Sequence, residues 1–517
     1  MERIERETSY NKCRERKEII SDVSCDYTLP DYLGDIKRIV MIRECVSVGG
    51  AYYEAGQLFG GGIVTYNVIY VDAEGKLASV EFSSDYECSS KCDTDNPIDV
   101  CITSRLLNVN LRATTPRKLV AKATLSSNLR AHSEESILLP EEFNSDILEY
   151  RTEICDVRSS YITRLPEREY AEKICFLDGV MLDDVSIIAK SANPYIRLVE
   201  SEDGAIIIKG EVKIECAVMC APLAPIKETV TVQINEECQA KAKHPIHLQA
   251  LTNVSSLVIS VNATESGCEI MCDMILDISV IEEENKTVCM PTDAYAPGSI
   301  TECGYDTVTL DSIVGVIDES FKNEARFDRS DLGMKDIRDI IVTDATLKSD
   351  PLKREGDAIL LTGEIKYSGM ATEITEDGAI SYVSFKNTVP FSYNVNNYLQ
   401  NIDNFTFDIT ASVHDIECTI DKGDVVCGCS LKFTGIIGAK KNCSYISSVS
   451  LTDKATAAQV RKVSVYYPDK DESLYDVAKK FDTTCRAVAN INSLGIDVAS
   501  TPTAKGGLKD VRRLIIY

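Results

Sequence analysis

The sequence is short of basic residues and of long apolar runs. It holds 55 Lys and Arg against 81 Asp and Glu, which gives a net charge of −26 at pH 7. A charge this negative repels phosphate groups, so nucleic acid and an anionic membrane surface are poor partners. No stretch approaches the roughly 20 consecutive apolar residues of a transmembrane segment. The charged first residues, MERIERETSYNKCRERKE, lack the apolar core of a secretory signal, so we expect a cytoplasmic chain.

Motifs of catalysis and of metal binding are also missing. The sequence contains no G-x-S-x-G turn, no P-loop and no H-E-x-x-H, and no set of nucleophile, base and orienting residue can be assembled. A structural zinc site usually needs four convergent ligands, often in C-x2-C pairs. The chain has no such pair and only four histidines. We therefore predict that it is not an enzyme and has no catalytic residues, no metal site and no cofactor.

Cysteine, in contrast, is abundant, with 20 residues. This is still well below the roughly 8–10% of a disulfide scaffold, and a chain without an export route favours reduced thiols. Several cysteines lie two or four positions apart, and these pairs are Cys88/Cys92, Cys216/Cys220, Cys268/Cys272 and Cys427/Cys429. We interpret them as core thiols, because free cysteine on an apolar strand face behaves as a small hydrophobic residue. A metal or redox role is the alternative.

Three segments repeat one strand pattern with a constant internal spacing. Each begins with a glycine followed by alternating apolar and polar residues, and these glycines are Gly62, Gly210 and Gly363. An aspartate stands 27 positions before each glycine, namely Asp35, Asp183 and Asp336. One offset kept in three places indicates a triplicated module. We interpret the aspartates as caps of a helix or turn, with a ligand role as the alternative.

A second alternating strand lies later in each copy, at residues 119–125, 268–278 and 425–434. One face of each is apolar and the other polar, as in antiparallel sheets with one side in water. We therefore predict a mainly β protein of three tandem antiparallel β-rich modules, at residues 1–140, 141–295 and 300–446. An acidic bridge at 134–142 and a proline-containing turn region at 291–299 would separate the modules. Residues 447–461 would form a flexible linker.

The last part of the chain, residues 462–517, has a different pattern. Residues 463–467 and 514–516 read as short strands, and two helices are expected between them, the first at 472–481 and the second after Thr483 or Thr484. The expected order is βααβ. This part has nine Lys and Arg and seven Asp and Glu, a charge of +2, which leaves −28 for the remainder.

This order and several residues within it are similar to those of a LysM domain. The family pattern places Gly-Asp-[Ser/Thr]-Leu-aromatic at the start of the first helix, then [Ile/Val]-Ala and a second aromatic. Glu472-Ser-Leu-Tyr475, Val477-Ala478 and Phe481 match these places, and Asn490 or Asn492 matches the family's asparagine after the second helix. Asp471 departs from the pattern, because it stands where the glycine of the glycan-binding turn belongs.

The stretch Leu29–Val40 (LPDYLGDIKRIV) and the strand Gly62–Tyr70, together with the LysM-like domain, resemble a known architecture. It is that of the SipL-like spore coat morphogenetic proteins of anaerobic spore-forming Firmicutes, in which SPOCS modules precede a LysM domain. The resemblance implies a non-enzymatic adaptor of the mother cell that localises coat proteins around the forespore. It also implies that the LysM domain binds the coat morphogenetic ATPase SpoIVA, while the β modules offer edges and faces for self-association or coat proteins.

Partner binding is therefore expected at the C-terminal domain. We predict Tyr475 as an exposed aromatic anchor and Val463 as its apolar neighbour, since tyrosine is enriched at interfaces; a partly buried Tyr475 is the alternative. The full set of candidate residues is Val463, Leu474, Tyr475, Asn490, Ile491 and Asn492. Two other functions remain open at this point: a protein that binds peptidoglycan or N-acetylglucosamine polymers of the cortex or cell wall, and a structural subunit of a spore-surface polymer.

Overall fold

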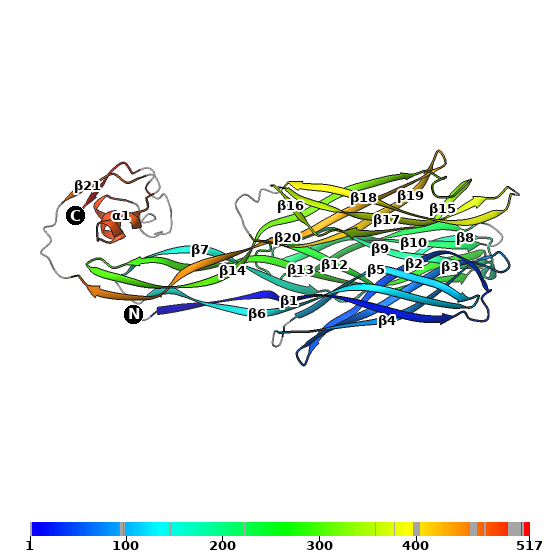
Figure 1. Cartoon of the computed structure of the whole chain (residues 1–517), viewed down its shortest axis with the longest axis horizontal. Coiled ribbons are helices and arrows are strands. Elements are labelled where there is room, and N and C mark those ends of the chain that lie inside the picture. The colour runs from blue at the N-terminus through cyan, green and yellow to red at the C-terminus, as the bar shows by residue number, and fades with distance from the viewer. Residues whose placement is uncertain are drawn as a thin grey trace.

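The computed structural model is an elongated molecule built mostly from long antiparallel strands (Figure 1). The residues described are 3–93, 97, 99–143, 147–220, 224–356, 358–376, 378–396, 404–454, 463–469, 472–494, 508 and 511–517. The prediction of a mainly β protein with antiparallel sheets is confirmed. Helical structure within the described ranges is limited to a 3-10 turn, η1 (Leu182–Asp184), and two short helices, α1 (Leu474–Lys480) and α2 (Cys485–Ile491). Neither α1 nor α2 has the length to cross a membrane, and no other described helix could do so.

The first six strands form two three-stranded sheets, which we call unit 1. The strands are β1 (Arg3–Thr28), β2 (Ile36–Glu54), β3 (Gln57–Asp72), β4 (Leu77–Lys91), β5 (Asp99–Thr115) and β6 (Lys118–Phe143). One sheet has the order β1-β6-β5 and the other β2-β3-β4. Their apolar faces pack on each other, so that Val64 and Tyr66 of β3 share a core with Leu125 of β6.

The same arrangement of strands recurs twice along the chain. Unit 2 contains β7 (Glu149–Arg164), β8 (Arg168–Asp178), β9 (Val185–Glu202), β10 (Ala205–Cys220), β11 (Ile226–Gln239), β12 (His247–Ala263) and β13 (Gly267–Tyr295). Unit 3 contains β14 (Ser299–Phe327), β15 (Ile337–Ser349), β16 (Lys353–Glu355), β17 (Ala358–Ile374), β18 (Ile380–Asn396), β19 (Phe405–Asp421) and β20 (Asp424–Asp453). The last strand of each unit pairs with both the first and the preceding one, as β13 does with β7 and β12 and β20 with β14 and β19. The strands β10 and β17 are central in the second sheets, as β3 is in unit 1.

The repeated glycines occupy equivalent places in these central strands, where the neighbouring backbone comes very close. A Cβ added to Gly62 would lie 2.0 Å from the carbonyl oxygen of Ser47. The corresponding distances are 2.3 Å from Gly210 to Tyr195 and 2.3 Å from Gly363 to Lys348. No side chain fits at such distances, so the glycine pattern follows from close strand packing. Of the repeated aspartates, Asp35 and Asp336 directly precede β2 and β15, and Asp183 lies in η1.

Three segments that the sequence assigned to connectors belong wholly or partly to strands. Residues 134–142 continue β6, residues 291–295 continue β13, and residues 447–453 continue β20. These strands remain paired to their ends with β1, β7 and β14. Their polar composition is that of a ribbon with one face in water rather than that of a loop. The rest of the expected linker, residues 455–461, lies outside the described residues.

The three units pack in a closed ring. Strand β4 of unit 1 contacts β9 of unit 2, β11 contacts β15 of unit 3, and β18 returns to β2. One apolar cluster joins all three units, and its members include Met41 and Ile69, Ala189 and Ala217, and Val342 and Met370. Each pair lies six residues after the repeated aspartate and seven after the repeated glycine. Equivalent residues thus meet in an approximately threefold arrangement.

Beyond the ring, the ribbons β1/β6, β7/β13 and β14/β20 continue together as a stem (Figure 1). Its core takes residues from all three ribbons, among them Leu139, Val157, Met290 and Leu310. The C-terminal residues fold at the tip of this stem, and we call them the head. The head consists of β21 (Ser464–Tyr466), α1, α2 and β22 (Leu514–Ile516), in that order.

Candidate interaction site on the head

Local capping interactions define both helices of the head. Ser473 forms a capping box with Asp476: its hydroxyl accepts a hydrogen bond from the Asp476 amide (3.2 Å), and its own amide donates to the Asp476 carboxylate (3.0 Å). The Thr484 hydroxyl accepts from the amide of Ala487 (3.1 Å) and begins α2. Leu474 is buried in the apolar core of the head.

Asn492 connects the end of α2 to the sheet of the head. Its carboxamide oxygen accepts a hydrogen bond from the Ile515 amide (2.6 Å), and its Nδ2 donates to the Ile515 carbonyl (2.7 Å). Asn492 is therefore a structural residue of the head. Its neighbours Asn490 and Ile491 are exposed and remain available to a partner.

The small sheet of the head has one buried and one exposed face. Tyr466, Leu514 and Ile516 face the core, and alternate residues point away from it. These alternate residues form what we call the apolar face, and they are Val463, Val465, Tyr467, Ile515 and Tyr517. Their side chains are 38% to 68% exposed, and Val465 pairs with Ile515 across the two strands.

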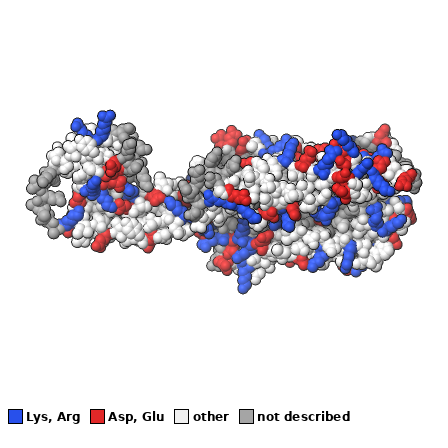
Figure 2. All heavy atoms as spheres, turned by 45° about the horizontal axis from the view of Figure 1, so that its top comes forward, with Lys and Arg blue, Asp and Glu red and all other residues white. Residues whose placement is uncertain are grey.

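Sequence reasoning identified Val463 but missed the other four residues of the apolar face. The alternation in VSVYY (463–467) and LIIY (514–517) carries the missing signal, because side chains two apart in a strand share a face. The surroundings of the face are charged: Arg512 and Arg513 are exposed beside β22. Figure 2 shows basic and acidic side chains close together at the head end of the molecule.

The expectation that Tyr475 is an exposed anchor is wrong, because its side chain is 0% exposed. Its ring packs edge-on against Tyr295 at the end of β13, with 5.1 Å between ring centroids. The guanidinium carbon of Arg151, on β7, lies 4.8 Å from the centre of the Tyr475 ring. Val463, predicted as the apolar neighbour of Tyr475, is 59% exposed and belongs to the apolar face, whereas Tyr475 is buried.

Hydrogen bonds and ion pairs surround this aromatic contact. Arg151 pairs with Asp476 and donates to the Ser473 hydroxyl (3.1 Å). Lys479 pairs with Asp293 (2.6 Å), and Lys454 pairs with Asp482 (2.7 Å). The phenol of Tyr295 donates to the carbonyl of Thr483 (2.9 Å). We call this set of contacts between head and stem the docking interface.

Burial and charge across the docking interface shift several pKa values. Burial raises the pKa of the Tyr475 phenol and raises the pKa of the Cys485 thiol to about 12. Burial alone would raise the pKa of Asp476, but its hydrogen bonds with Ser473 and the charge of Arg151 hold that pKa below its ordinary value. At neutral pH, the tyrosine and the thiol are thus neutral and the carboxylate is charged.

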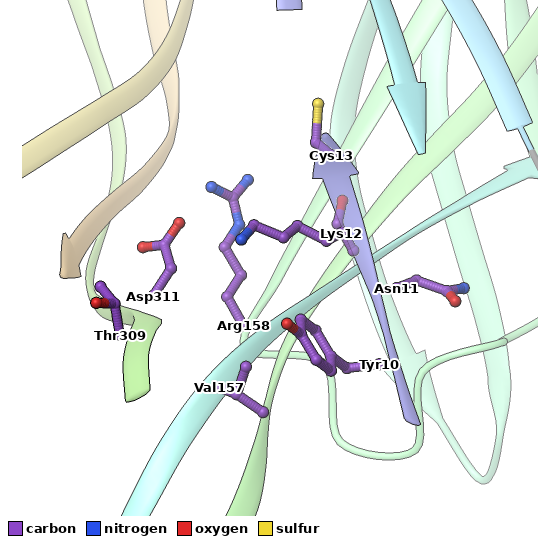
Figure 3. A pocket seen from close by; sticks show the side chains of 9 residues that line it. Tyr10, Asn11, Lys12, Cys13, Val157, Arg158, Thr309 and Asp311 are labelled. Carbon is purple, nitrogen blue, oxygen red and sulfur yellow. The ribbon is translucent and has the colours of Figure 1, made fainter. Parts of the chain in front are cut away.

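Cavities also lie away from the head. A small one of about 30 Å³ lies where β1, β7 and β14 meet, with Lys12, Arg158 and Asp311 among its lining residues (Figure 3). A cleft of about 830 Å³ involves all three units and is lined by Ser412 and His414, whose Oγ and Nε2 atoms are 2.7 Å apart. Burial lowers the pKa of His414 to about 4, so its ring is a weak base at neutral pH and we assign the pair no catalytic role.

Half of the cysteines contribute to the cores. Ten of the 20 are buried, including both members of the pairs 216/220, 268/272 and 427/429, and the described residues contain no disulfide. In that same part of the chain, no group of three or more His, Cys, Asp or Glu side chains is arranged to hold a metal ion.

No protein-family model matches the chain, and no curated protein sequence matches it significantly.

Proposed function

We propose that the protein is a non-enzymatic assembly adaptor whose acidic β body carries a head that binds another protein. The observation that carries this proposal is the apolar face, where five large apolar side chains are exposed on one small sheet. Grouped exposed apolar residues mark protein interaction sites, and tyrosine is enriched at them. The charge of the head is small, +2 against −28 for the rest of the chain. Shape and apolar contact, more than charge, would therefore select its partner.

The resemblance in the sequence suggests the biological setting. We propose that units 1 to 3 are SPOCS-like modules, that the head is a LysM-like domain, and that the chain is a SipL-like protein. It would then act in the mother cell, localise coat proteins around the forespore, and bind the ATPase SpoIVA. The recurrence of one strand order in three units and the βααβ order of the head support this proposal.

Co-purification of the full chain with SpoIVA tests the proposal. Val465→Glu places a charge in the middle of the apolar face and should reduce capture at least about tenfold, which corresponds to roughly 1.4 kcal/mol. The control is Val258→Glu, because Val258 on β12 is 51% exposed against 56% for Val465. Equal capture by both variants would contradict the role of the apolar face.

A second assay separates the glycan-binding alternative. Purified peptidoglycan should retain the full chain weakly, and retention should disappear at high salt because it depends only on charge. Salt-resistant retention that is lost in Val465→Glu would replace the adaptor proposal with wall binding. Ordered polymers of the purified chain in electron micrographs would instead favour a spore-surface subunit.

A further inference from the structure

The head has two distinct surfaces in this structure. The apolar face is exposed, and the surface around Tyr475 is covered by the tip of the stem. Tyr475 belongs to the apolar cluster of the head, and the ring that packs edge-on against it, Tyr295, comes from β13 of the stem. The buried state of Tyr475 therefore depends on how the head sits on the stem.

We propose that the docking interface is a releasable latch: the stem tip covers the Tyr475 side of the head, and a protein that binds this side must displace the stem. This inference rests on the proposed function of the head as a protein-binding domain. The partner for this side resembles the stem tip in its chemistry, presenting an aromatic ring flanked by a cationic and an anionic side chain, as Tyr295, Arg151 and Asp293 do.

The composition of the docking interface suits reversible closure. One aromatic pair lies at its centre, and the ion pairs around it are partly in water: the Lys479 side chain is 42% exposed and that of Asp293 is 32% exposed. Partly exposed ion pairs contribute little to stability and are screened by salt. Most of the closing free energy thus depends on the Tyr475–Tyr295 contact, and a competitor has few strong contacts to replace.

Cys485 provides a direct readout of closure that needs no partner. This thiol lies at the start of α2, is buried, and interacts with Tyr295 and Glu149 of the stem. Opening of the latch should expose it to a maleimide, and peptide mapping by mass spectrometry separates it from the other cysteines. A carbodiimide gives a second readout, because it joins the Lys479 amine to the Asp293 carboxylate only in the closed state, where they are 2.6 Å apart.

Two variants of the full chain test the latch. Tyr295→Ala removes the central ring, and Lys479→Glu places like charges against Asp293 without altering the aromatic pair. Tyr295→Ala should raise the labelling rate of Cys485 at least about tenfold, the change expected for a loss of about 1.4 kcal/mol. Lys479→Glu should raise the rate by a smaller factor, because the ion pair that it reverses is partly exposed. Lys480→Glu is the control, because it makes the same charge change at a lysine that contacts Tyr466 within the head. SpoIVA is the competing protein in this test, contacting the Tyr475 side of the head in addition to the apolar face, so Tyr295→Ala should also raise its capture.

The outcomes separate this inference from the proposed function. Unchanged labelling of Cys485 in both variants, with the carbodiimide crosslink between Lys479 and Asp293 retained in Tyr295→Ala, would overturn the latch even if SpoIVA binds. Increased labelling with unchanged capture would show that the stem does not compete with the partner, which also overturns the inference. Failure of SpoIVA to bind any variant, including the wild type, would contradict the proposed function, while the labelling result would still decide whether the latch opens.

Discussion

Asp408 shows how a single residue can join the three units of the ring. Its carboxylate on β19 accepts hydrogen bonds from Arg16 (2.8 Å) and Arg130 (3.0 Å) of unit 1, and from Arg158 of unit 2 (3.3 Å). Burial alone would raise the pKa of Asp408, but the charges of these arginines hold it below the ordinary value for an aspartate. The carboxylate thus remains charged at neutral pH and offsets three guanidinium groups.

Asp408→Asn should therefore destabilise the protein strongly. The amide removes the negative charge and leaves three arginines close together, with Glu283, paired to Arg158 (2.6 Å), as a remaining buried counter-charge. Breaking a buried charge network in this way costs roughly 3–5 kcal/mol, which denaturant unfolding of both proteins would measure. Asp22→Asn is the control, because Asp22 forms an exposed pair with Lys122 and its loss should leave the free energy of unfolding nearly unchanged.

His132 leads to a prediction about pH. Burial, with the charge of Arg130 as the next cause, lowers the pKa of this histidine from 6.5 to about 4. In the unfolded chain the imidazole takes up a proton near pH 6.5, while in the folded protein it stays neutral down to about pH 4. The folded state therefore binds fewer protons in this window, and stability falls as the pH drops from 6.5 towards 4, by up to about 3 kcal/mol.

Unfolding curves at several pH values between 7.5 and 4.5 would test this. His132→Asn should make the free energy of unfolding depend less on pH. His244→Asn, at an exposed position, should leave this dependence as in the wild type. An equal slope in the wild type and in His132→Asn would show that His132 does not contribute.

At the scale of the element, sequence patterns predicted the strands well where one face was apolar. The alternation around residues 425–434 and 268–278 corresponds to the buried faces of β20 and β13. The ends of β20 and β6 were not predicted, because residues 447–453 and 134–140 face water on one side and contact other ribbons on the other. Local composition does not distinguish a two-stranded ribbon with one face in water from a loop when the pairing strand is more than 100 residues away in the sequence.

The repeated glycines lead to a prediction at this scale. Gly210→Ala would place a Cβ 2.3 Å from the Tyr195 carbonyl oxygen, so β9 and β10 would have to separate, at a cost of roughly 1–3 kcal/mol. Gly428→Ala is the matched control within a strand, because its nearest neighbour, the Asn323 carbonyl oxygen, would lie 3.7 Å away. In thermal unfolding, Gly210→Ala should have a lower melting temperature than Gly428→Ala. Equal melting temperatures would contradict the packing argument.

The candidate site shows a similar limit of sequence reasoning. The capping residues and the apolar spacing placed α1 and α2 correctly in order, and Val463 and Ile491 are exposed as a binding role requires. The orientation of Tyr475 was not accessible in this way. Its position outside the core stripe of α1 predicts exposure, and contacts with residues far away in the sequence, Tyr295 and Arg151, reverse that expectation.

At the scale of the whole molecule, the units are not independent modules joined by flexible segments. The sequence suggested tandem modules with free edges and faces, but Met41, Ala189 and Val342 meet in one cluster that closes the ring. Each of these residues looks like an ordinary core residue of its own strand, so no local pattern reveals that it packs against another unit. The surfaces left for partners are therefore at the head and on the outside of the ring and stem.

The closed ring predicts that units 1 to 3 unfold together. Because the central cluster and the Asp408 network each use residues from all three units, loss of one unit exposes buried surface on the other two. Calorimetry of the full chain should show one main transition whose calorimetric and van't Hoff enthalpies agree.

Met370→Lys places a charge in the cluster, where Met370 is buried. This change should lower the free energy of unfolding of all three units together by at least about 3 kcal/mol. Met181→Lys, at an exposed methionine, should leave the free energy of unfolding as in the wild type. Separate transitions for the three units, or a Met370→Lys effect limited to part of the unfolding signal, would mean that the units fold independently and that the ring is not what stabilises them.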